Sequence, residues 1–69
     1  MKRKRLDSSS IASVGYDRES QTLEVEFTNG GVYRYLEVSE FVHAALIRSP
    51  SPGTYLNTQI KPHYRFVDG

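Results

Sequence analysis

A regular alternation of apolar and polar side chains, followed by a turn of small residues, limits the folds open to this chain more than any other feature. In residues 22–28 (TLEVEFT), every second side chain from Leu23 is apolar, and glutamates stand between them. This period of two predicts a strand with one buried face and one solvated face. Residues 29–31 (Asn-Gly-Gly) supply the positive-φ positions of a tight hairpin, and residues 32–38 (VYRYLEV) are expected to form the returning strand.

The length of this turn decides which side chains face the core, because a slip of one residue moves every side chain to the other face. A two-residue turn would pair Val25 with Arg34 and turn the arginine inward. A three-residue loop at 29–31 pairs Val25 with Tyr35 instead. It also sets Arg34 opposite Glu26 on the outer face, where the two form a favourable cross-strand ion pair. We therefore expect the three-residue loop.

A shorter alternation precedes the hairpin. In residues 11–16 (IASVGY), Ala12, Val14 and Tyr16 are expected on one face, which predicts a first strand. The polar, turn-rich residues 17–21 then connect it to the hairpin.

The first expected helix follows the hairpin. Ser39 is suited to cap its N-terminus, and Glu40 places a carboxylate where the helix dipole favours one. The helix is expected to end near Arg48. Its apolar stripe has helical spacing and comprises Val38, Phe41, Val42, Ala45 and Leu46.

A second, shorter helix is expected between Ser51, a potential cap, and Pro62, which has no amide hydrogen to donate. Leu56 and Ile60 share its apolar face. Residues 63–69 contain enough aromatic and aliphatic side chains to dock on the body, but they fit no assigned element.

Residues 9–69 are therefore expected to form one α+β domain. The architecture is a three-stranded antiparallel β-meander followed by two short helices packed on one face, in the order β-β-β-α-α. A chain of 69 residues buries only roughly 60% of its unfolded surface, which favours support from a second copy or another protein.

Charge is distributed unevenly. Four of the nine basic side chains stand together at the N-terminus, in Lys2, Arg3, Lys4 and Arg5, and the remainder of the chain carries five basic against eight acidic residues. Few apolar residues accompany them, so residues 1–8 are expected to form a flexible basic arm.

Composition excludes several classes of function. The chain has no cysteine, which removes disulfides, thiolate zinc sites and thiol nucleophiles. His43 and His63 lack partners at metal-ligand spacing, and no catalytic motif is present, so we expect no metal, no cofactor and no enzymatic activity. No apolar run approaches the roughly 18 residues of a membrane helix, and the basic start lacks a signal-peptide core. We expect a cytoplasmic protein without a membrane partner.

Several segments, taken in order, resemble the KTSC domain, a small family that takes its name from the C-terminal domain of some lysyl-tRNA synthetases and also occurs alone. The segments are Ser8-Ser9-x-Ile11, Val14-Gly15-Tyr16-Asp17, Leu23-x-Val25-x-Phe27, Gly31-x-Tyr33-x-Tyr35 and Ser51-x-Gly53-x-Tyr55-x-Asn57-x-x-Ile60. The similarity extends from about residue 6 to Tyr64. Ser39 departs from the family, where a proline is expected. The resemblance implies RNA binding through the family's fusion to a synthetase.

Candidate nucleic-acid-binding residues fall into three groups. They are the arm (Lys2, Arg3, Lys4 and Arg5), the strand segment Tyr33, Arg34 and Tyr35, and the basic residues Lys61 and Arg65 near the second helix. Flexible cations suit phosphate contacts, and alternating aromatics can stack unpaired bases. The alternative for the two tyrosines is packing in the core, which the expected hairpin register favours.

A polar turn at the start of the second helix is a further candidate site. It comprises Ser51, Gly53, Tyr55 and Asn57. Its backbone amides would suit an anion, and the alternative is a turn and cap that fixes the helix pair.

The sequence therefore predicts a small non-catalytic binding module. The first hypothesis is binding of RNA, or another nucleic acid such as DNA, through the arm and the basic residues near the second helix. The alternative is an interaction module for another protein or for a second copy, using an open sheet edge or the sheet face without helices.

Overall fold

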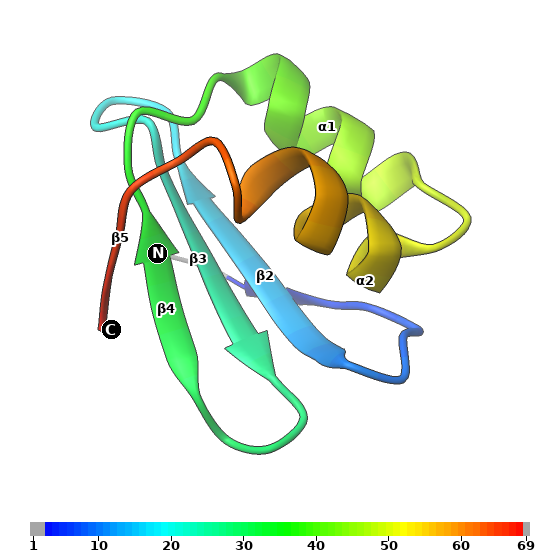
Figure 1. Cartoon of the computed structure of the whole chain (residues 1–69). Coiled ribbons are helices and arrows are strands. Elements are labelled where there is room, and N and C mark those ends of the chain that lie inside the picture. The colour runs from blue at the N-terminus through cyan, green and yellow to red at the C-terminus, as the bar shows by residue number, and fades with distance from the viewer. Residues whose placement is uncertain (1–2, 69) are drawn as a thin grey trace.

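The computed structural model describes residues 3–68, which form a five-stranded antiparallel sheet with helices on one face (Figure 1). The strands lie side by side in chain order. The elements are β1 (Arg3–Arg5), β2 (Ile11–Asp17), β3 (Thr22–Phe27), β4 (Val32–Tyr35), α1 (Glu40–Arg48), α2 (Pro52–Tyr55), the π-helical turn η1 (Leu56–Ile60) and β5 (Phe66–Asp68). The α+β class is confirmed, but the expected three-stranded meander is wrong, because a short strand is added at each edge.

The first added strand comes from the segment expected to be a flexible arm. Residues 3–5 pair with β2, with Lys4 opposite Val14. The guanidinium of Arg3 donates to Glu24 on β3 at 2.6 Å, so a carboxylate on the sheet holds the segment in place. The composition of the arm alone cannot show this contact, because the acidic partner stands about twenty residues further along the chain.

The second added strand comes from the C-terminal segment. β5 pairs with β4, with Phe66 opposite Tyr35 and Asp68 opposite Tyr33. The amide of Leu36 also donates to the carbonyl of Arg65, which extends the pairing beyond the strand. Three residues are too few for a periodic pattern to identify them as a strand.

A β-bulge interrupts β2. Ile11 pairs with Phe27, but Ser13 pairs with Glu26, so Ala12 is an extra residue on this strand. The bulge turns both Ile11 and Val14 into the core, where they are at most 1% exposed. The expectation that Ala12 shares the face of Val14 is therefore wrong.

The hairpin loop has three residues, as expected, but it lies one residue earlier, at 28–30. The amide of Phe27 donates to the carbonyl of Gly31, and Gly30 takes the positive-φ position at φ 95°. Val25 therefore pairs with Tyr33 rather than Tyr35. This is a shift of two residues, so both tyrosines keep the predicted face.

Both helices begin where the sequence predicts. The Ser39 hydroxyl accepts from the amide of Val42 and caps α1. The second helix starts at Pro52 and runs through the π-helical turn, although the Ser51 hydroxyl contacts Thr54 rather than a backbone amide. Phe41 is 83% exposed, so its expected place on the apolar stripe is wrong.

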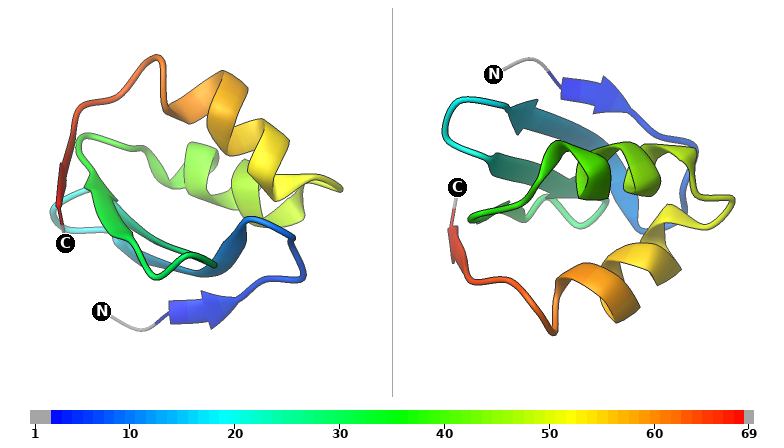
Figure 2. Two further views of the ribbon diagram at one scale, coloured as in Figure 1. Left: turned by 60° about the horizontal axis from the view of Figure 1, so that its bottom comes forward. Right: turned by 90° about the horizontal axis from the view of Figure 1, so that it is seen from above.

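The core lies between the sheet and the helices, which cover the β2 side of one face and leave the other face open (Figure 2). Its members come from every layer and are Ile11, Val14, Leu23, Val25, Tyr35, Val38, Leu46, Leu56 and Ile60. The helices do not extend across β4 and β5, so part of the helix-side face remains uncovered there.

Candidate nucleic-acid-binding surface

Three aromatic side chains form a row across β3, β4 and β5, where the helices do not cover the sheet. The ring centroids of Phe27 and Tyr33 lie 5.6 Å apart, and those of Tyr33 and Phe66 lie 5.3 Å apart. Both pairs meet edge to face, an arrangement that aromatic quadrupoles favour. We call Phe27, Tyr33 and Phe66 the aromatic row.

Strand pairing produces this row. The register of β4 with β5 places the side chain of Phe66 on the same face as Tyr35 and Tyr33. A Cβ atom at Gly31 would lie 3.4 Å from the ring of Tyr33, so that ring packs close to the end of the hairpin loop. Phe66 is 55% exposed and Phe27 and Tyr33 are partly buried, so the row is anchored in the core and open to solvent.

Charge at the aromatic row is limited and of both signs. The ammonium of Lys61 lies 5.2 Å from the ring centroid of Phe27, within the range of a cation–π contact. Asp68 stands opposite Tyr33 on β5 and brings a carboxylate to the outer end. A phosphate would therefore be attracted to the Lys61 end of the row.

The three residues of β4 that were predicted to bind nucleic acid lie in three different environments. Tyr33 belongs to the aromatic row, whereas Tyr35 is 2% exposed, and its burial raises the pKa of its hydroxyl. No base can stack on Tyr35 without displacing its neighbours. Arg34 points to the opposite face of the sheet, where it donates to Glu24 at 3.0 Å.

The predicted basic arm lies away from the row, with Arg3 and Arg5 on that opposite face and Lys4 on the helix side of β1. Arg3 contacts Glu24 and Glu26, which neutralise its charge. Arg5 and Lys4 are exposed on β1, at the sheet edge farthest from β5. Lys2 lies outside the described residues.

Glu24 is the charge centre of the open face, because its side chain is only 7% exposed and lies between two guanidiniums. The hydrogen bond from Arg34 is the largest influence and lowers the pKa of Glu24. Burial opposes this, and Arg3 adds to the lowering. Glu24 is therefore ionised at neutral pH, and the two arginines are committed to it.

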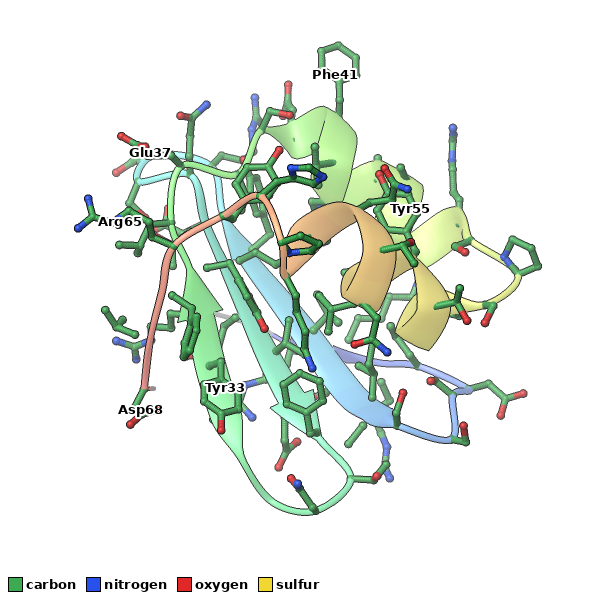
Figure 3. The ribbon with its side chains drawn as sticks, in the orientation of Figure 1. Tyr33, Glu37, Phe41, Tyr55, Arg65 and Asp68 are labelled. Carbon is green, nitrogen blue, oxygen red and sulfur yellow. The ribbon has the colours of Figure 1, made fainter. Side chains whose placement is uncertain are left out.

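The two predicted basic residues near the second helix also lie in different places. Lys61 reaches the aromatic row, as described, but Arg65 is exposed and points away from Tyr33 (Figure 3). Lys61 and Arg65 were grouped because they are close in the sequence, and a turn at residues 61–64 separates their positions in the fold.

The predicted polar turn meets the serines that precede β2. Residues 8–10 and 51–54, with Asn57, line a polar hollow of about 380 Å³. A Cβ atom at Gly53 would clash with the Ser10 hydroxyl, so the two segments are in close contact. Tyr55 is partly buried against the core instead. Asp7 is the charged residue of this lining, so the hollow does not suit an anion.

The sequence did not identify Phe27 and Phe66 as members of a binding surface. Phe27 was assigned to the core, and Phe66 had no assigned element. The sequence held no signal for Phe66, because Phe66, Val67 and Asp68 do not alternate between apolar and polar side chains.

Two kinds of site are absent from residues 3–68. No group of three histidine, aspartate or glutamate side chains there could hold a metal ion. Within the same residues, no helix combines the length and the apolar character that crossing a bilayer requires.

Comparisons of the sequence and of the structure with known proteins find similarity to the same family. The model of the KTSC domain family matches residues 7–64. An uncharacterized protein of Stutzerimonas stutzeri is 51% identical over 67 residues, covering 96% of this chain and 94% of that protein. A crystal structure of a KTSC domain protein from Yersinia pestis superimposes with a TM-score of 0.95 at 32% identity, covering 99% of this chain and 96% of that one.

A longer protein also contains a related segment. The lysine–tRNA ligase of Nostoc punctiforme is 37% identical over 60 residues, which is 87% of this chain but 11% of the ligase. The similarity therefore concerns one small part of that enzyme.

Proposed function

The chain belongs to the KTSC domain family, and from that premise we propose that it is a non-catalytic module that binds single-stranded RNA on the aromatic row. The row is the observation that carries the proposal. Its rings lie at the surface beside Lys61, on a sheet face that the helices leave open. Unpaired bases stack on aromatic side chains presented in this way.

The related segment in a lysine–tRNA ligase supports RNA as the nucleic acid, because that enzyme acts on tRNA. On the same ground we propose that the module acts in the cytoplasm, where tRNA is charged. In the described residues, the row lies apart from the arm cations, so stacking rather than phosphate contact is expected to dominate the affinity.

This mechanism predicts a weak dependence on salt. Each phosphate neutralised on a single strand contributes about −0.7 to the slope of log affinity against log salt. With Lys61 as the cation at the row, a slope of about −0.7 is expected, whereas binding by four arm cations would give roughly −3. Lys61→Gln should flatten the slope further.

The decisive measurement is fluorescence anisotropy with a labelled eight-nucleotide poly-uridine strand. Phe66→Ala should weaken binding by roughly fivefold or more, since stacking contributes about 1–3 kcal/mol per base. Val67→Ala is the matched control, because Val67 is its neighbour on β5 but faces the other side of the sheet. Equal affinities for the two variants would overturn the proposal.

A double variant separates stacking from electrostatic binding by the arm. Lys4→Gln with Arg5→Gln removes two exposed cations and keeps the contact between Arg3 and Glu24. The proposal requires little loss of affinity in this variant. A large loss here, with Phe66→Ala unaffected, would instead place the RNA on β1.

A further inference from the structure

Phe41 is the most exposed large apolar side chain among the described residues, at 83%. It lies in the first turn of α1 and points away from the body of the molecule (Figure 3). None of the RNA contacts proposed above involves it. Single exposed apolar side chains are common on protein surfaces, so the significance of Phe41 depends on what lies beside it.

A groove of about 600 Å³ lies beside Phe41, between α1 and the β1–β2 edge of the sheet. Tyr16 and His43 line it, and their rings stack on one another with centroids 4.7 Å apart. The aliphatic part of the lining comprises Val14, Ala44 and Ile47. Because the two rings already stack on each other, the groove suits aliphatic side chains better than further aromatic groups.

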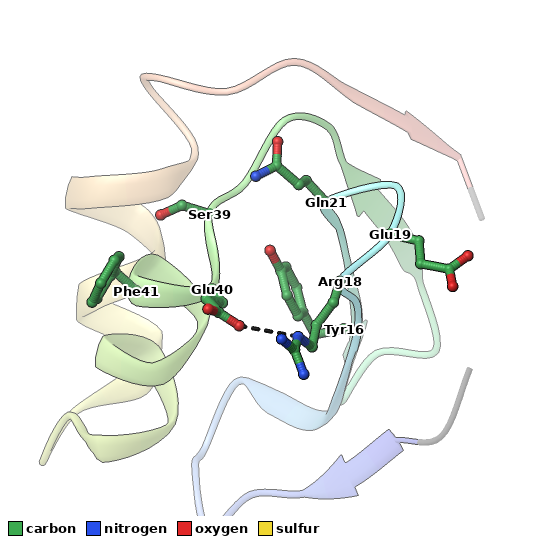
Figure 4. Close-up of a pocket in the computed structure, with 7 residues that line it drawn as sticks. All are labelled: Tyr16, Arg18, Glu19, Gln21, Ser39, Glu40 and Phe41. Atoms are coloured by element: carbon green, nitrogen blue, oxygen red, sulfur yellow. Dashed lines mark ion pairs between the residues drawn. The ribbon is translucent and has the colours of Figure 1, made fainter.

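The charges that line the groove are mainly positive. They are Arg3, Lys4 and Arg18 against the single carboxylate of Glu40. Arg18 pairs with Glu40 at 3.1 Å (Figure 4), and Arg3 is bound by Glu24 on the sheet. Among residues 3–68, Lys4 takes part in no ion pair. An occupant of the groove is therefore expected to carry negative charge.

The groove adjoins the outer edge of β1, where backbone groups are available for pairing. The amide of Leu6 donates to the carbonyl of Ala12, and hydrogen-bonded pairs alternate along antiparallel strands. The backbone groups of Lys4 therefore bond to β2, while those of Arg3 and Arg5 point outward from the sheet. Outward-pointing groups of this kind accept an extended polypeptide as an additional strand.

These features together define the occupant. Strand-edge backbone groups and an aliphatic hollow suit a polypeptide, whereas RNA supplies neither a strand nor aliphatic side chains. Lys4 and Arg5, which take part in no ion pair within residues 3–68, require that polypeptide to be acidic. A second copy joined through its own β1 is disfavoured, because its cations would stand against these two.

The edge of β5 is the other place where a strand could be added. Phe66 and Val67 are exposed there, at 55% and 47%. The ring of Phe66 already contacts Tyr33 and Tyr35, however, and Asp68 would repel an acidic segment. The helices also leave that part of the sheet uncovered, so a strand on β5 lacks the second surface that α1 provides beside β1 (Figure 1).

We infer that an acidic, extended segment of another protein adds to the sheet beside β1. Its carboxylates face Arg5 on the open face, and its aliphatic side chains enter the groove beside Phe41. The residues opposite Arg3 and Arg5 form the hydrogen-bonded pairs, so the amides of the carboxylate-bearing residues point toward β1. This site is separate from the aromatic row, and the inference does not depend on RNA binding.

Fluorescence anisotropy with a labelled nine-residue peptide of alternating leucine and glutamate tests the inference. The wild-type chain should bind it, and should bind a peptide with lysine in place of glutamate at least about tenfold more weakly. N-methylation of the glutamates should abolish binding, whereas N-methylation of the leucines should not, because only the first set of amides faces β1. Absence of binding, or an equal loss from both methylated peptides, would overturn the inference.

Two pairs of variants locate the bound peptide. Arg5→Glu should weaken binding about tenfold, and Arg65→Glu, an equal change of charge at another exposed arginine, should not. Phe41→Ser should weaken binding by a similar factor. Val67→Ser is its control, because it removes an exposed apolar side chain at the other edge of the sheet. Equal effects within either pair would contradict the inference.

Amide exchange identifies the edge that the peptide joins. Binding should slow exchange of the Arg5 amide and leave the amides of Phe66 and Asp68, which point outward from β5 by the same alternation, unchanged. Slower exchange at β5 alone would place the peptide there. Displacement of the peptide by poly-uridine would show that RNA occupies the groove. Either of these two results would refute the inference.

Discussion

The two edge strands, β1 and β5, have the same length and the same position relative to the sheet, yet different forces hold them. Each has three residues, and all three are exposed. Arg3 attaches β1 by contacts to Glu24 at 2.6 Å and Glu26 at 3.4 Å. Phe66 attaches β5 by contacts between its ring and those of Tyr33 and Tyr35.

This difference shows how a strand too short to be stable alone can be added to a sheet. Three residues form few hydrogen bonds, and their net contribution is modest. Each edge therefore depends on one side chain that reaches a partner already fixed by the central hairpin. The stability of β1, which is held by charge, should therefore depend on pH and salt. The stability of β5, which is held by apolar contact, should not.

The largest effect is expected from Glu24→Gln. The variant removes the charge that accepts from both Arg3 and Arg34, and hydrogen bonds to charged groups contribute about 1.5–3 kcal/mol each. Because both arginines are partly solvated, we expect a loss of about 2 kcal/mol in the free energy of unfolding, measured in urea. Amide exchange should accelerate in β1 and not in β5.

Glu26→Gln provides the control for this change, since its side chain is 39% exposed and its contact with Arg3 is longer. It should cost less than about 1 kcal/mol. Equal losses for the two variants would show that Glu24 does not hold β1 in the way described.

A smaller effect, confined to the other edge, is expected from Phe66→Ala. Its side chain is about half exposed, so the loss should be about 1 kcal/mol, near half the value for a fully buried phenylalanine. Hydrogen exchange should accelerate in β5 and remain unchanged in β1. Faster exchange at both edges would contradict independent attachment.

Acid should release β1 before β5. The folded-state pKa of Glu24 is lowered, so the unfolded state binds more protons in acid. The stabilisation is fully present above the ordinary glutamate pKa of about 4.3 and is lost as the pH falls through the lower folded-state value. Exchange measured at several acidic pH values should show this loss in β1 of the wild type. If Glu24→Gln shows the same pH dependence, another carboxylate is responsible.

The smallest effect is expected from salt. At 1 M sodium chloride the screening length is about 3 Å, which weakens contacts between partly exposed charges. Protection of the β1 amides should fall by a few tenths of a kcal/mol, as is typical for such pairs. Protection of β5 should stay constant or rise. A fall at both edges would indicate a general loss of stability instead.

The central hairpin and the helix starts were predictable, because their signals are local. Alternation through residues 22–28 gave the correct faces, and Ser39 and Pro52 marked the helix starts. The loop position was one residue off, because either Gly30 or Gly31 can take the positive-φ position. The predicted faces of both strands are still correct, because each observed cross-strand partner differs from the predicted one by two residues.

The edges and the aromatic row were not predictable, because their causes are not local. From the sequence alone, Arg3 is assigned to a solvated arm and Phe66 to an unassigned tail. Their partners, Glu24 and Tyr33, are far away in the chain and are brought to them only by the fold. The exposure of Phe41 was missed for a related reason. Helical spacing gives a stripe, but the extent of the stripe that is covered depends on the partner surface.

The bulge at Ala12 has a consequence for how related chains are aligned. Deletion of this residue would let β2 pair regularly with β3, and Ile11 would stay opposite Phe27 on the core face. The contact between Ser10 and Gly53 would be kept with it, because Ser10 lies on the same side of the bulge as Ile11. A gap at this column therefore removes the local distortion of the bulge without changing which side chains of β2 face the core.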